Sequence, residues 1–331
     1  MKAIVLTAPG APETLQLQTL PDPQLQHSTD LLIQLKAAGV NPIDTKLRQR
    51  GSFHPDRTPT VLGCDGAGIV TAVGSHVERF KIGDEVYFCH GGLGGPKGNY
   101  AEYTVVDERF VAPKPKTLTF AQAAAAPLVL ITAWESLYDR GRLQAVQTAL
   151  IHGGAGGVGH VAIQLAKIRG ARVCTTVSSP EKAAFVQSLG AELPILYKTT
   201  DFVQAARTWT DGKGVHLALD TVGGALLEQT FGAVRVYGDI VTILAPDPAT
   251  NWKVARDRNL RLSLELMLTP LLQESIEDQK HQARLLEDCT RWFEQGLLNI
   301  NLTHTFPLAE AAAAHRLLEQ GGMVGKIALE I

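Results

Sequence analysis

The fold is decided by the stretch Ala149-Leu150-Ile151-His152-Gly153-Gly154-Ala155-Gly156-Gly157-Val158-Gly159. Three of its glycines form the pattern G-x-G-x-x-G, directly after an apolar strand and directly before a segment of helical periodicity. Glycine permits the tight turn and a close backbone approach to a pyrophosphate, and the start of the helix presents free N–H groups to the anion. Because the strand–loop–helix context is met, we predict a dinucleotide-binding loop made by Gly154, Gly156, Gly157 and Val158.

The segments after this loop alternate between strand and helix. Ser179 and Pro180 provide a cap and a first helical position ahead of a helix at 182–189. Such alternation is typical of a parallel sheet covered by helices on both faces. We predict strands at 148–152, 172–177, 193–196, 216–220, 239–244 and 261–266, and a helix at 157–169. A long helix from 270 to about 295 and a strand–helix–strand piece at the end of the chain follow.

The first third of the chain has a different pattern. Short β-rich runs are separated by Gly and Pro, which predicts a twisted antiparallel barrel. Thr119 and Gln122 have the spacing of a capping box that opens an Ala-rich helix. The predicted strands of this part are 2–6, 31–37, 68–73, 85–88 and 100–106.

Composition excludes several classes of protein. The 331 residues carry a formal net charge of −2, so no strong field favours nucleic acid or an anionic membrane. Four scattered cysteines cannot form a disulfide framework or a zinc knuckle, and reduced thiols indicate a reducing compartment. The most apolar stretch, 123–134, is interrupted by Pro127 and is too short to span a membrane. We therefore expect a soluble, cytoplasmic protein.

The end of the second strand of the alternating part bears on the choice of dinucleotide. NAD sites usually carry Asp or Glu there to bind the ribose 2′-hydroxyl. This chain has Ser178 and Ser179, with Lys182 nearby, and these supply hydroxyl and ammonium donors for a 2′-phosphate. Glu181, the nearest acid, is assigned to the first helical turn, and the alternative for Lys182 is a solvated helix residue. The pattern favours NADPH over NADH.

Further motifs occur in a fixed order along the chain. Together with the glycine loop they resemble the medium-chain dehydrogenase/reductase superfamily, and within it the zinc-independent quinone oxidoreductase (zeta-crystallin-like) branch. The resemblance covers essentially the whole chain and is more specific for fold and cofactor than for substrate. The motifs are Gly39-Val40-Asn41-Pro42-Ile43-Asp44, Gly63-Cys64-Asp65-Gly66-Ala67-Gly68, Gly83-Asp84-Glu85-Val86, Ala126-Pro127-Leu128, Thr132-Ala133-Trp134-Glu135 and Gly325-Lys326-Ile327-Ala328-Leu329.

This resemblance implies an α/β protein with two domains and a cleft for NADPH and substrate. A GroES-like β-barrel catalytic domain is expected from residues 1–122 and 268–331, and a Rossmann NADP-binding domain with a doubly wound parallel sheet from 123–267. A homodimer is expected as well, through strand 261–266. The implied site residues are Asn41 and Thr132 at the nicotinamide, Ser178, Ser179, Lys182 and Tyr197 at the 2′-phosphate, Leu244 and Ala245 at the carboxamide, and Gly325 and Lys326 in the cleft.

The resemblance also bears on metal chemistry. Zinc-dependent relatives need Cys, His and Cys for the catalytic metal, and the matching positions here are Asn41, Cys64 and the region of Pro127 and Leu128. We therefore expect no metal site, because a catalytic zinc needs three protein ligands. Without that Lewis acid, a conjugated acceptor is favoured over a simple alcohol. Oriented hydrogen-bond donors then stabilise the enolate or quinol oxyanion that forms when hydride is added to an enone or a quinone.

One position departs from the family pattern. Many quinone reductases have Tyr where this chain has Lys46. A buried lysine titrates nearer neutrality, so we hypothesise that Lys46 protonates or polarises the substrate; the alternative is an exposed helix lysine. The leading hypothesis is an NADPH-dependent reductase of quinones or other conjugated carbonyls. An alkenal/enone reductase without quinone activity and a non-catalytic NADPH-binding redox sensor are the alternatives, and Asn41 and Thr132 argue against the sensor.

Overall fold

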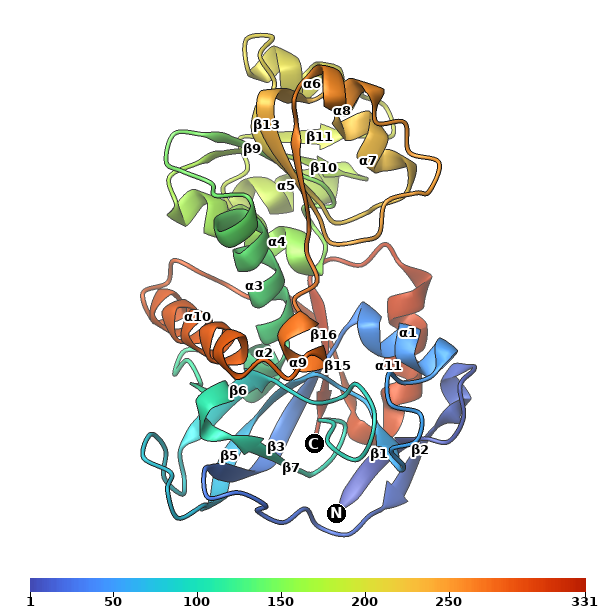
Figure 1. Ribbon diagram of the computed structural model, residues 1–331, viewed down its shortest axis with the longest axis vertical. Coiled ribbons are helices and arrows are strands. Elements are labelled where there is room, and N and C mark those ends of the chain that lie inside the picture. Colours follow the sequence, from blue (N-terminus) through green and yellow to red (C-terminus); the bar gives the residue numbers. More distant parts are fainter. The chain divides into compact units, whose positions relative to one another are not determined.

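The computed structural model describes residues 1–331, and its chain passes from one unit to a second and back. Unit 1 comprises Met1–Leu128 and Leu268–Ile331, and unit 2 comprises Val129–Met267. No helix in either unit is long and apolar enough to cross a membrane. Figure 1 shows the elements of each unit, coloured along the sequence.

Unit 1 is built on two sheets, and both ends of the chain contribute strands to it. The seven-stranded sheet has the order β15-β16-β3-β5-β6-β8, with β7 paired to β3, and the three-stranded sheet has the order β2-β1-β4. Only β15 and β16 pair in parallel, so the sheets are mainly antiparallel, as predicted. The strands are β1 (Lys2–Leu6), β2 (Leu15–Thr19), β3 (Asp30–Val40), β4 (Thr60–Val61), β5 (Asp65–Val73), β6 (Glu85–Cys89), β7 (Tyr103–Asp107), β8 (Ala112–Pro113), β15 (Leu302–Pro307) and β16 (Lys326–Glu330).

The helices of unit 1 confirm one prediction and correct another. The capping box of Thr119 and Gln122 is present at the start of α2 (Phe120–Ala124). The single helix predicted from 270 to 295 is wrong: the chain forms α9 (Thr269–Leu272) and then α10 (Ile276–Glu294). Glu274 lies between them with φ of +52°, a left-handed conformation that no helix continues through. The other helices of this unit are α1 (Pro42–Arg50) and α11 (Ala311–Gln320).

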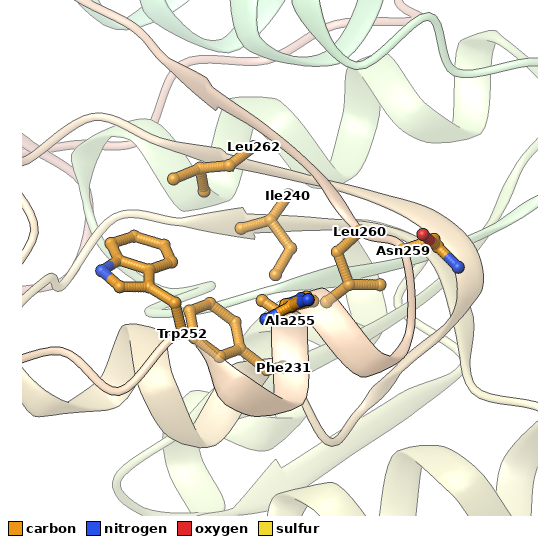
Figure 2. A pocket seen from close by; sticks show the side chains of 8 residues that line it. Phe231, Ile240, Trp252, Ala255, Asn259, Leu260 and Leu262 are labelled. Atoms are coloured by element: carbon orange, nitrogen blue, oxygen red, sulfur yellow. The ribbon is translucent and has the colours of Figure 1, made fainter.

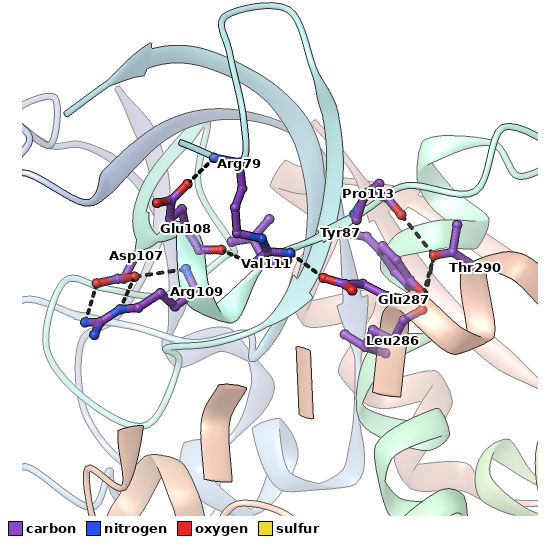
Figure 3. Close-up of polar contacts among 10 residues, drawn as sticks. All are labelled: Arg79, Tyr87, Asp107, Glu108, Arg109, Val111, Pro113, Leu286, Glu287 and Thr290. Atoms are coloured by element: carbon purple, nitrogen blue, oxygen red, sulfur yellow. Dashed lines mark hydrogen bonds and ion pairs between the residues drawn. The ribbon is translucent and has the colours of Figure 1, made fainter. Parts of the chain in front are cut away.

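Helix α10 holds the two pieces of unit 1 together (Figure 3). The Tyr87 hydroxyl on β6 donates to the Leu286 carbonyl oxygen on α10 at 2.6 Å. The Thr290 hydroxyl lies 2.9 Å from the Pro113 carbonyl oxygen and 3.1 Å from the Tyr87 hydroxyl. These contacts join residues more than 170 positions apart in sequence, because α10 belongs to the C-terminal piece. They fix that piece against the sheet of the N-terminal piece.

Unit 2 is a parallel six-stranded sheet in the order β11-β10-β9-β12-β13-β14. Numbered along the unit, this is the order 3-2-1-4-5-6 of a Rossmann fold, in which ligands bind beyond the carboxyl ends of the strands. Strand β9 is buried along its whole length, as expected for the centre of a sheet covered on both faces. The strands are β9 (Thr148–Ile151), β10 (Arg172–Val177), β11 (Leu193–Leu196), β12 (Val215–Asp220), β13 (Val234–Thr242) and β14 (Arg261–Leu264).

The helices of unit 2 begin close to the predicted positions. Helix α5 begins at Pro180, after Ser179 as its N-cap, which confirms the predicted cap and first position. Helix α3 ends at Trp134 and continues as a π-helical turn over Glu135–Arg140. The helices are α3 (Pro127–Trp134), whose first two residues belong to unit 1, α4 (Gly157–Ile168), α5 (Pro180–Ser188), α6 (Phe202–Trp209), α7 (Ala225–Thr230) and α8 (Lys253–Asp257).

Candidate functional site

The glycine loop connects β9 to α4 at the carboxyl end of the parallel sheet. Gly156 is the N-cap of α4, so the first-turn N–H groups of Gly157 and Val158 have no acceptor within the helix. A Cβ at Gly154 would overlap the side chain of Thr175 on β10, and one at Gly159 would overlap the backbone of Gly153. The loop is therefore packed too closely for side chains, which leaves its backbone as the surface offered to a phosphate.

A buried histidine that the sequence analysis gave no role holds the start of this loop. His152 Nε2 lies 2.9 Å from the Thr230 hydroxyl and His152 Nδ1 lies 3.2 Å from the Thr176 hydroxyl, which also accepts from Gly153 N. Because Thr230 donates to the Leu226 carbonyl oxygen, His152 carries its hydrogen on Nε2. Burial lowers the pKa of His152 to about 4, so the ring is neutral at physiological pH. The network ties the loop to β10 and α7.

The predicted 2′-phosphate residues lie at the ends of β10 and β11 and at the start of α5. Val177 and Leu196 are register partners on the parallel strands β10 and β11. The next residue on each strand, Ser178 and Tyr197, therefore lies at the same edge of the sheet. Lys182 lies in the first turn of α5 and is half-buried. Ser179 is engaged locally, since it caps α5 and hydrogen-bonds to Glu181, whose pKa is lowered by that bond.

The remaining predicted residues of unit 2 are on two further elements. Thr132 is buried in α3, with 4% of its surface exposed. Leu244 and Ala245 follow β13 at the carboxyl edge of the sheet. Asp220, at the end of β12, accepts from Val222 N and Gly223 N at 2.9 Å each and from the Thr242 hydroxyl at 3.1 Å. This carboxylate, absent from the sequence prediction, joins the ends of β12 and β13.

Unit 1 contains a buried cluster of charged and polar side chains around Asn41. Asn41 is the N-cap of α1, and its backbone N–H donates to Asp44 Oδ2 at 2.8 Å in a capping box. Its side-chain Nδ2 donates to Asp65 Oδ2 at 2.8 Å. Lys326, on β16, donates from Nζ to Asn41 Oδ1 and, at 3.1 Å, to the Val40 carbonyl oxygen. The three strand ends of β3, β5 and β16 thus bring one amide, one ammonium and two carboxyl groups together.

Burial dominates the electrostatics of this cluster. It raises the pKa of Asp44 to about 7, against the opposing effect of the hydrogen bond from Asn41 N. It raises the pKa of Asp65 to about 6, against the attraction of Lys326. It also lowers the pKa of Lys326, which the two carboxyl groups partly offset. Because two carboxyl groups face one ammonium, the cluster is close to neutral when one carboxyl group holds a proton.

The cluster extends to residues that the sequence analysis did not select. The Tyr100 hydroxyl lies 3.2 Å from Asp44 Oδ2 and 3.2 Å from His315 Nε2 on α11. Burial, and then the nearby Arg48, lowers the pKa of His315 to about 3. Arg48 is buried on α1 and pairs with Glu319. Residues 44, 100 and 315 share no sequence pattern, so only the fold brings them together.

Two predicted residues of unit 1 take positions that change their interpretation. Lys46 is exposed on α1, because the buried face of that helix carries Asp44, Thr45, Leu47 and Arg48. The burial on which its proposed chemistry was based is absent, and that premise was wrong. Gly325 precedes β16 with φ of +71°, and the ammonium of the following residue points to Asn41 inside unit 1.

Metal-ligating groups do not gather in this structure. No group of three or more His, Cys, Asp or Glu side chains has an arrangement that could hold a metal ion. Cys64 is fully buried beside Asp65, and burial raises the pKa of its thiol, which disfavours the thiolate that a metal needs. Cys89 is partly buried, and desolvation also raises the pKa of its thiol, which hydrogen-bonds to Asp65.

Unit 2 also contains an apolar cavity of about 290 Å³ (Figure 2). It lies beside α8 and strands β13 and β14, and no predicted site residue lines it. Its walls offer few polar atoms, so it lacks the donors that a phosphate or a carbonyl substrate requires. The lining residues are Phe231, Ile240, Trp252, Ala255, Arg256, Asn259, Leu260 and Leu262.

Comparison with known proteins identifies the family. Residues 27–116 match the alcohol dehydrogenase GroES-like domain, and residues 189–329 match the model described as zinc-binding dehydrogenase. The chain is 33% identical to the quinone oxidoreductase of Pseudomonas aeruginosa over 331 residues, with 99% of both chains covered. The chain belongs to the medium-chain dehydrogenase/reductase superfamily. As a member of this superfamily it is an oxidoreductase, with a GroES-like domain and a Rossmann-type parallel sheet.

This dehydrogenase/reductase is also similar to two further proteins. The chloroplastic NADPH-dependent alkenal/one oxidoreductase of Arabidopsis thaliana is 44% identical over 205 residues, which are 60% of this chain and 52% of the relative. The crystal structure of the Escherichia coli quinone oxidoreductase complexed with NADPH is 28% identical, with a TM-score of 0.87 and full coverage of both chains.

Proposed function

We propose that this medium-chain dehydrogenase/reductase is an NADPH-dependent, metal-independent reductase of conjugated carbonyl compounds, quinones or enones. The observation that carries the proposal is the donor set of the buried cluster in unit 1. Where zinc-dependent relatives need metal ligands, this chain has the Asn41 amide, held by the Lys326 ammonium and the Asp65 carboxylate. A hydrogen-bond donor at this position stabilises a developing oxyanion without a Lewis acid.

The residues of unit 2 fit a dinucleotide phosphate. The glycine loop has no room for side chains at Gly154 and Gly159, and α4 begins directly after it. We propose that Gly157 and Val158 bind the pyrophosphate through their backbone N–H groups, and that Gly156, whose own N–H donates to the Gly153 carbonyl oxygen at 2.9 Å, lets the backbone approach it closely. Ser178, Ser179, Lys182 and Tyr197 are the proposed ligands of the 2′-phosphate, and Thr132, Leu244, Ala245 and Gly325 are the further proposed contacts of the cofactor.

Bound NADPH supplies a hydride to the β-carbon of an enone or to a quinone ring. The chain's own groups then act on the oxygen atom of the acceptor. Asn41 donates a hydrogen bond to the carbonyl oxygen and stabilises the negative charge that develops there. We propose that Lys46, on the exposed face of α1, lies toward the substrate and attracts the same oxygen, and that the proton which completes the reduction comes from Lys46 or water.

The proposal extends to the assembly of the protein and to its compartment. Strand β14 pairs only with β13, and Leu264 on it is 63% exposed, so its free edge is available to a second copy of the chain. We propose a homodimer through this edge, which sedimentation can test. The four free cysteines are consistent with the cytoplasm as its compartment.

The test is a panel of acceptors with NADPH or NADH, followed by loss of the reduced nicotinamide absorbance. We expect NADPH oxidation with ortho- and para-quinones, enals or enones, no reduction of saturated aldehydes, and no loss of rate after dialysis against a chelator. Reduction of enones alone identifies the alkenal/enone reductase. If the protein binds NADPH but no acceptor oxidises it, the reductase proposal is overturned and the redox-sensor alternative is supported. A strong preference for NADH contradicts the proposed use of NADPH. Loss of activity after dialysis against a chelator contradicts the proposed metal-independent chemistry.

A further inference from the structure

The oxygen and the nitrogen of the Asn41 amide each have a hydrogen-bond partner, and together these partners allow only one orientation of the amide. An ammonium has only donor hydrogens, so the Asn41 atom that faces Lys326 Nζ is the oxygen Oδ1. A carboxylate is an acceptor, so the atom 2.8 Å from Asp65 Oδ2 is the nitrogen Nδ2. Exchanging the oxygen and nitrogen atoms of the amide would oppose donor to donor at one end and acceptor to acceptor at the other.

The Asp65 carboxylate is itself fixed. Its Oδ1 accepts from Leu128 N at 2.9 Å, and the Cys89 thiol hydrogen-bonds to the same carboxylate. Gly39 on the neighbouring strand lies so close that a Cβ there would approach Asp65 Oδ2 to 3.1 Å. With two further hydrogen bonds and no room to rotate, Asp65 presents Oδ2 to Asn41 in one position.

The ammonium of Lys326 is also held in one position. Its neighbour on β16, Ile327, is the register partner of Val40 on β3, and the ammonium donates back to the Val40 carbonyl oxygen at 3.1 Å. The side chain is 3% exposed, so water does not compete for the ammonium hydrogens. Strand pairing therefore determines where the ammonium meets the amide oxygen.

The remaining hydrogen-bonding capacity of Asn41 follows by counting. Its amide nitrogen carries two hydrogens, and Asp65 takes one of them. Its amide oxygen is occupied by the Lys326 ammonium. The capacity left for a ligand is one N–H. Asn41 is fully buried, so a ligand that reaches this N–H displaces the groups that now cover it, and it must offer an acceptor atom such as a carbonyl oxygen or oxyanion.

We propose that Lys326 and Asp65 are positioning residues that lock the Asn41 amide with its second N–H toward the acceptor oxygen of the substrate. This inference rests on the proposed function, because it assigns the donor in that reaction. Because the Asn41 amide is oriented before the reaction, no free energy is spent on rotating it when negative charge develops on the acceptor oxygen. The ammonium behind the amide oxygen also polarises the amide, which strengthens donation from its N–H.

The test is a pair of double-mutant cycles on the full-length protein. Asp65→Asn places an NH₂ group against either Asn41 Nδ2 or Leu128 N, because both oxygens of Asp65 accept hydrogen bonds, and Lys326→Met removes the donor to Oδ1. We expect each to lower kcat by about 10- to 100-fold, less than the loss of the oriented donor itself, and to change the Kd of NADPH less than about 3-fold. In an Asn41→Ala background, the same changes should lower kcat less than about 3-fold further, because the amide through which they act is gone.

Matched controls separate positioning from stability. Lys114→Met removes another buried ammonium of unit 1, which donates to the Leu118 carbonyl oxygen at 2.7 Å, and Asp30→Asn changes another buried carboxylate, which accepts from Gln26 N at 2.8 Å. We expect kcat to stay within about 3-fold in both. Lys326→Arg keeps the donors and should retain more activity than Lys326→Met; if Lys326→Met does not fold, the cycle is run with Lys326→Arg and Lys326→Gln.

The outcomes distinguish this inference from the proposed function. Wild-type protein that reduces no acceptor overturns the proposed function. Active wild-type protein in which the effects of Asp65→Asn and Lys326→Met multiply with that of Asn41→Ala overturns the positioning role alone. Loss of NADPH affinity in step with kcat also overturns it, since a general disturbance of the fold would then explain both.

Discussion

At the scale of single residues, the buried cluster of unit 1 contains a carboxyl group with a raised pKa, that of Asp44. Asp44 is fully buried on α1, and its Oδ1 has no hydrogen-bond partner. Burial raises its pKa from 3.8 to about 7, so the native state binds a proton there more tightly than the unfolded chain does. The stability that this group contributes is present below about pH 4 and is lost as pH rises through about 7.

Asp44→Asn should therefore change how stability depends on pH. An amide keeps an acceptor for Asn41 N and stays uncharged at every pH, so the variant avoids the cost of ionisation. We expect the free energy of unfolding of the variant relative to wild type to rise between pH 4 and pH 8, by at most about 4 kcal/mol. Urea denaturation across this range measures it, and parallel pH profiles for the two proteins would contradict the prediction. Asp65 is present in both proteins, but its ionisation is coupled to that of Asp44, so the pH at which the difference develops belongs to the pair of carboxyl groups.

Lys46 provides a second prediction at this scale. It is exposed on α1 and contributes nothing to the buried face, so its replacement should not affect folding. If Lys46 acts on the substrate, Lys46→Met lowers kcat/KM for quinones or enones by about 10-fold, and leaves the Kd of NADPH unchanged. The exposed Arg50 on the same helix offers the control Arg50→Met. Unchanged turnover in Lys46→Met would remove this residue from the mechanism.

The family resemblance could identify Asn41 and Lys326 as site residues, but not that Lys326 and Asp65 hold the Asn41 amide. Asn41 and Asp44 are close in the chain and form a capping box that follows a readable local pattern. Asp65 and Lys326 reach Asn41 only because β3 pairs with β5 on one side and β16 on the other. A buried ion cluster of this kind depends on strand pairing across nearly 300 residues, which no local pattern encodes.

At the scale of elements, the glycine loop and the parallel strands were the most predictable features. Their signals are local: glycines at fixed spacing, apolar runs, and Ser179 and Pro180 at the start of α5. The break between α9 and α10 was missed because Gln273, Glu274 and Ser275 include neither Gly nor Pro. The left-handed Glu274 ends α9 in a local hydrogen-bonded motif, in which Ser275 N donates to the Pro270 carbonyl oxygen at 2.8 Å.

The turn from β10 to α5 carries a prediction on cofactor choice. Lys182 and Glu181 are neighbours in the first turn of α5, with opposite charges near the proposed 2′-phosphate site. Lys182→Ala should raise KM for NADPH by about 10-fold and leave KM for NADH unchanged, because only NADPH carries the extra phosphate. Glu181→Gln should lower KM for NADPH by a few-fold, since it removes a like charge. Equal effects of Lys182→Ala on the two cofactors would exclude Lys182 from 2′-phosphate recognition.

The contact of α10 with β6 carries a prediction on stability (Figure 3). The buried Tyr87 hydroxyl donates to the Leu286 carbonyl oxygen and accepts from the Thr290 hydroxyl, so Tyr87→Phe removes both hydrogen bonds. We expect the free energy of unfolding to fall by about 1–3 kcal/mol, with kcat unchanged. Tyr103→Phe, at a partly exposed hydroxyl on β7, is the control and should cost less than about 1 kcal/mol. Equal costs in thermal or urea unfolding would contradict the anchoring role of Tyr87.

At the scale of the whole molecule, the two units differ in how the chain builds them. Unit 2 is one continuous segment, Val129–Met267, whose sheet contains no strand from elsewhere. Unit 1 needs both ends of the chain, because β16 pairs with β3 and α10 is anchored to β6. Local periodicity therefore suffices to predict the organisation of unit 2, whereas the return of the chain into unit 1 was expected only from the family resemblance.

This difference predicts how fragments of the chain behave. Residues 129–267 contain a complete buried core, including Leu150, Phe231 and Ile240, and should fold alone with a cooperative thermal transition. The fragment retains the glycine loop and the turn after β10, so it should bind NADPH more weakly than the full chain but with the same preference over NADH. Residues 1–128 lack β15, β16 and α10, which leaves the edge of β3 and the apolar face of its sheet uncovered, and they should not fold cooperatively. Circular dichroism melts and NADPH titration of both fragments measure this, and a cooperative transition in residues 1–128 alone would show that the C-terminal piece is not required to form that sheet.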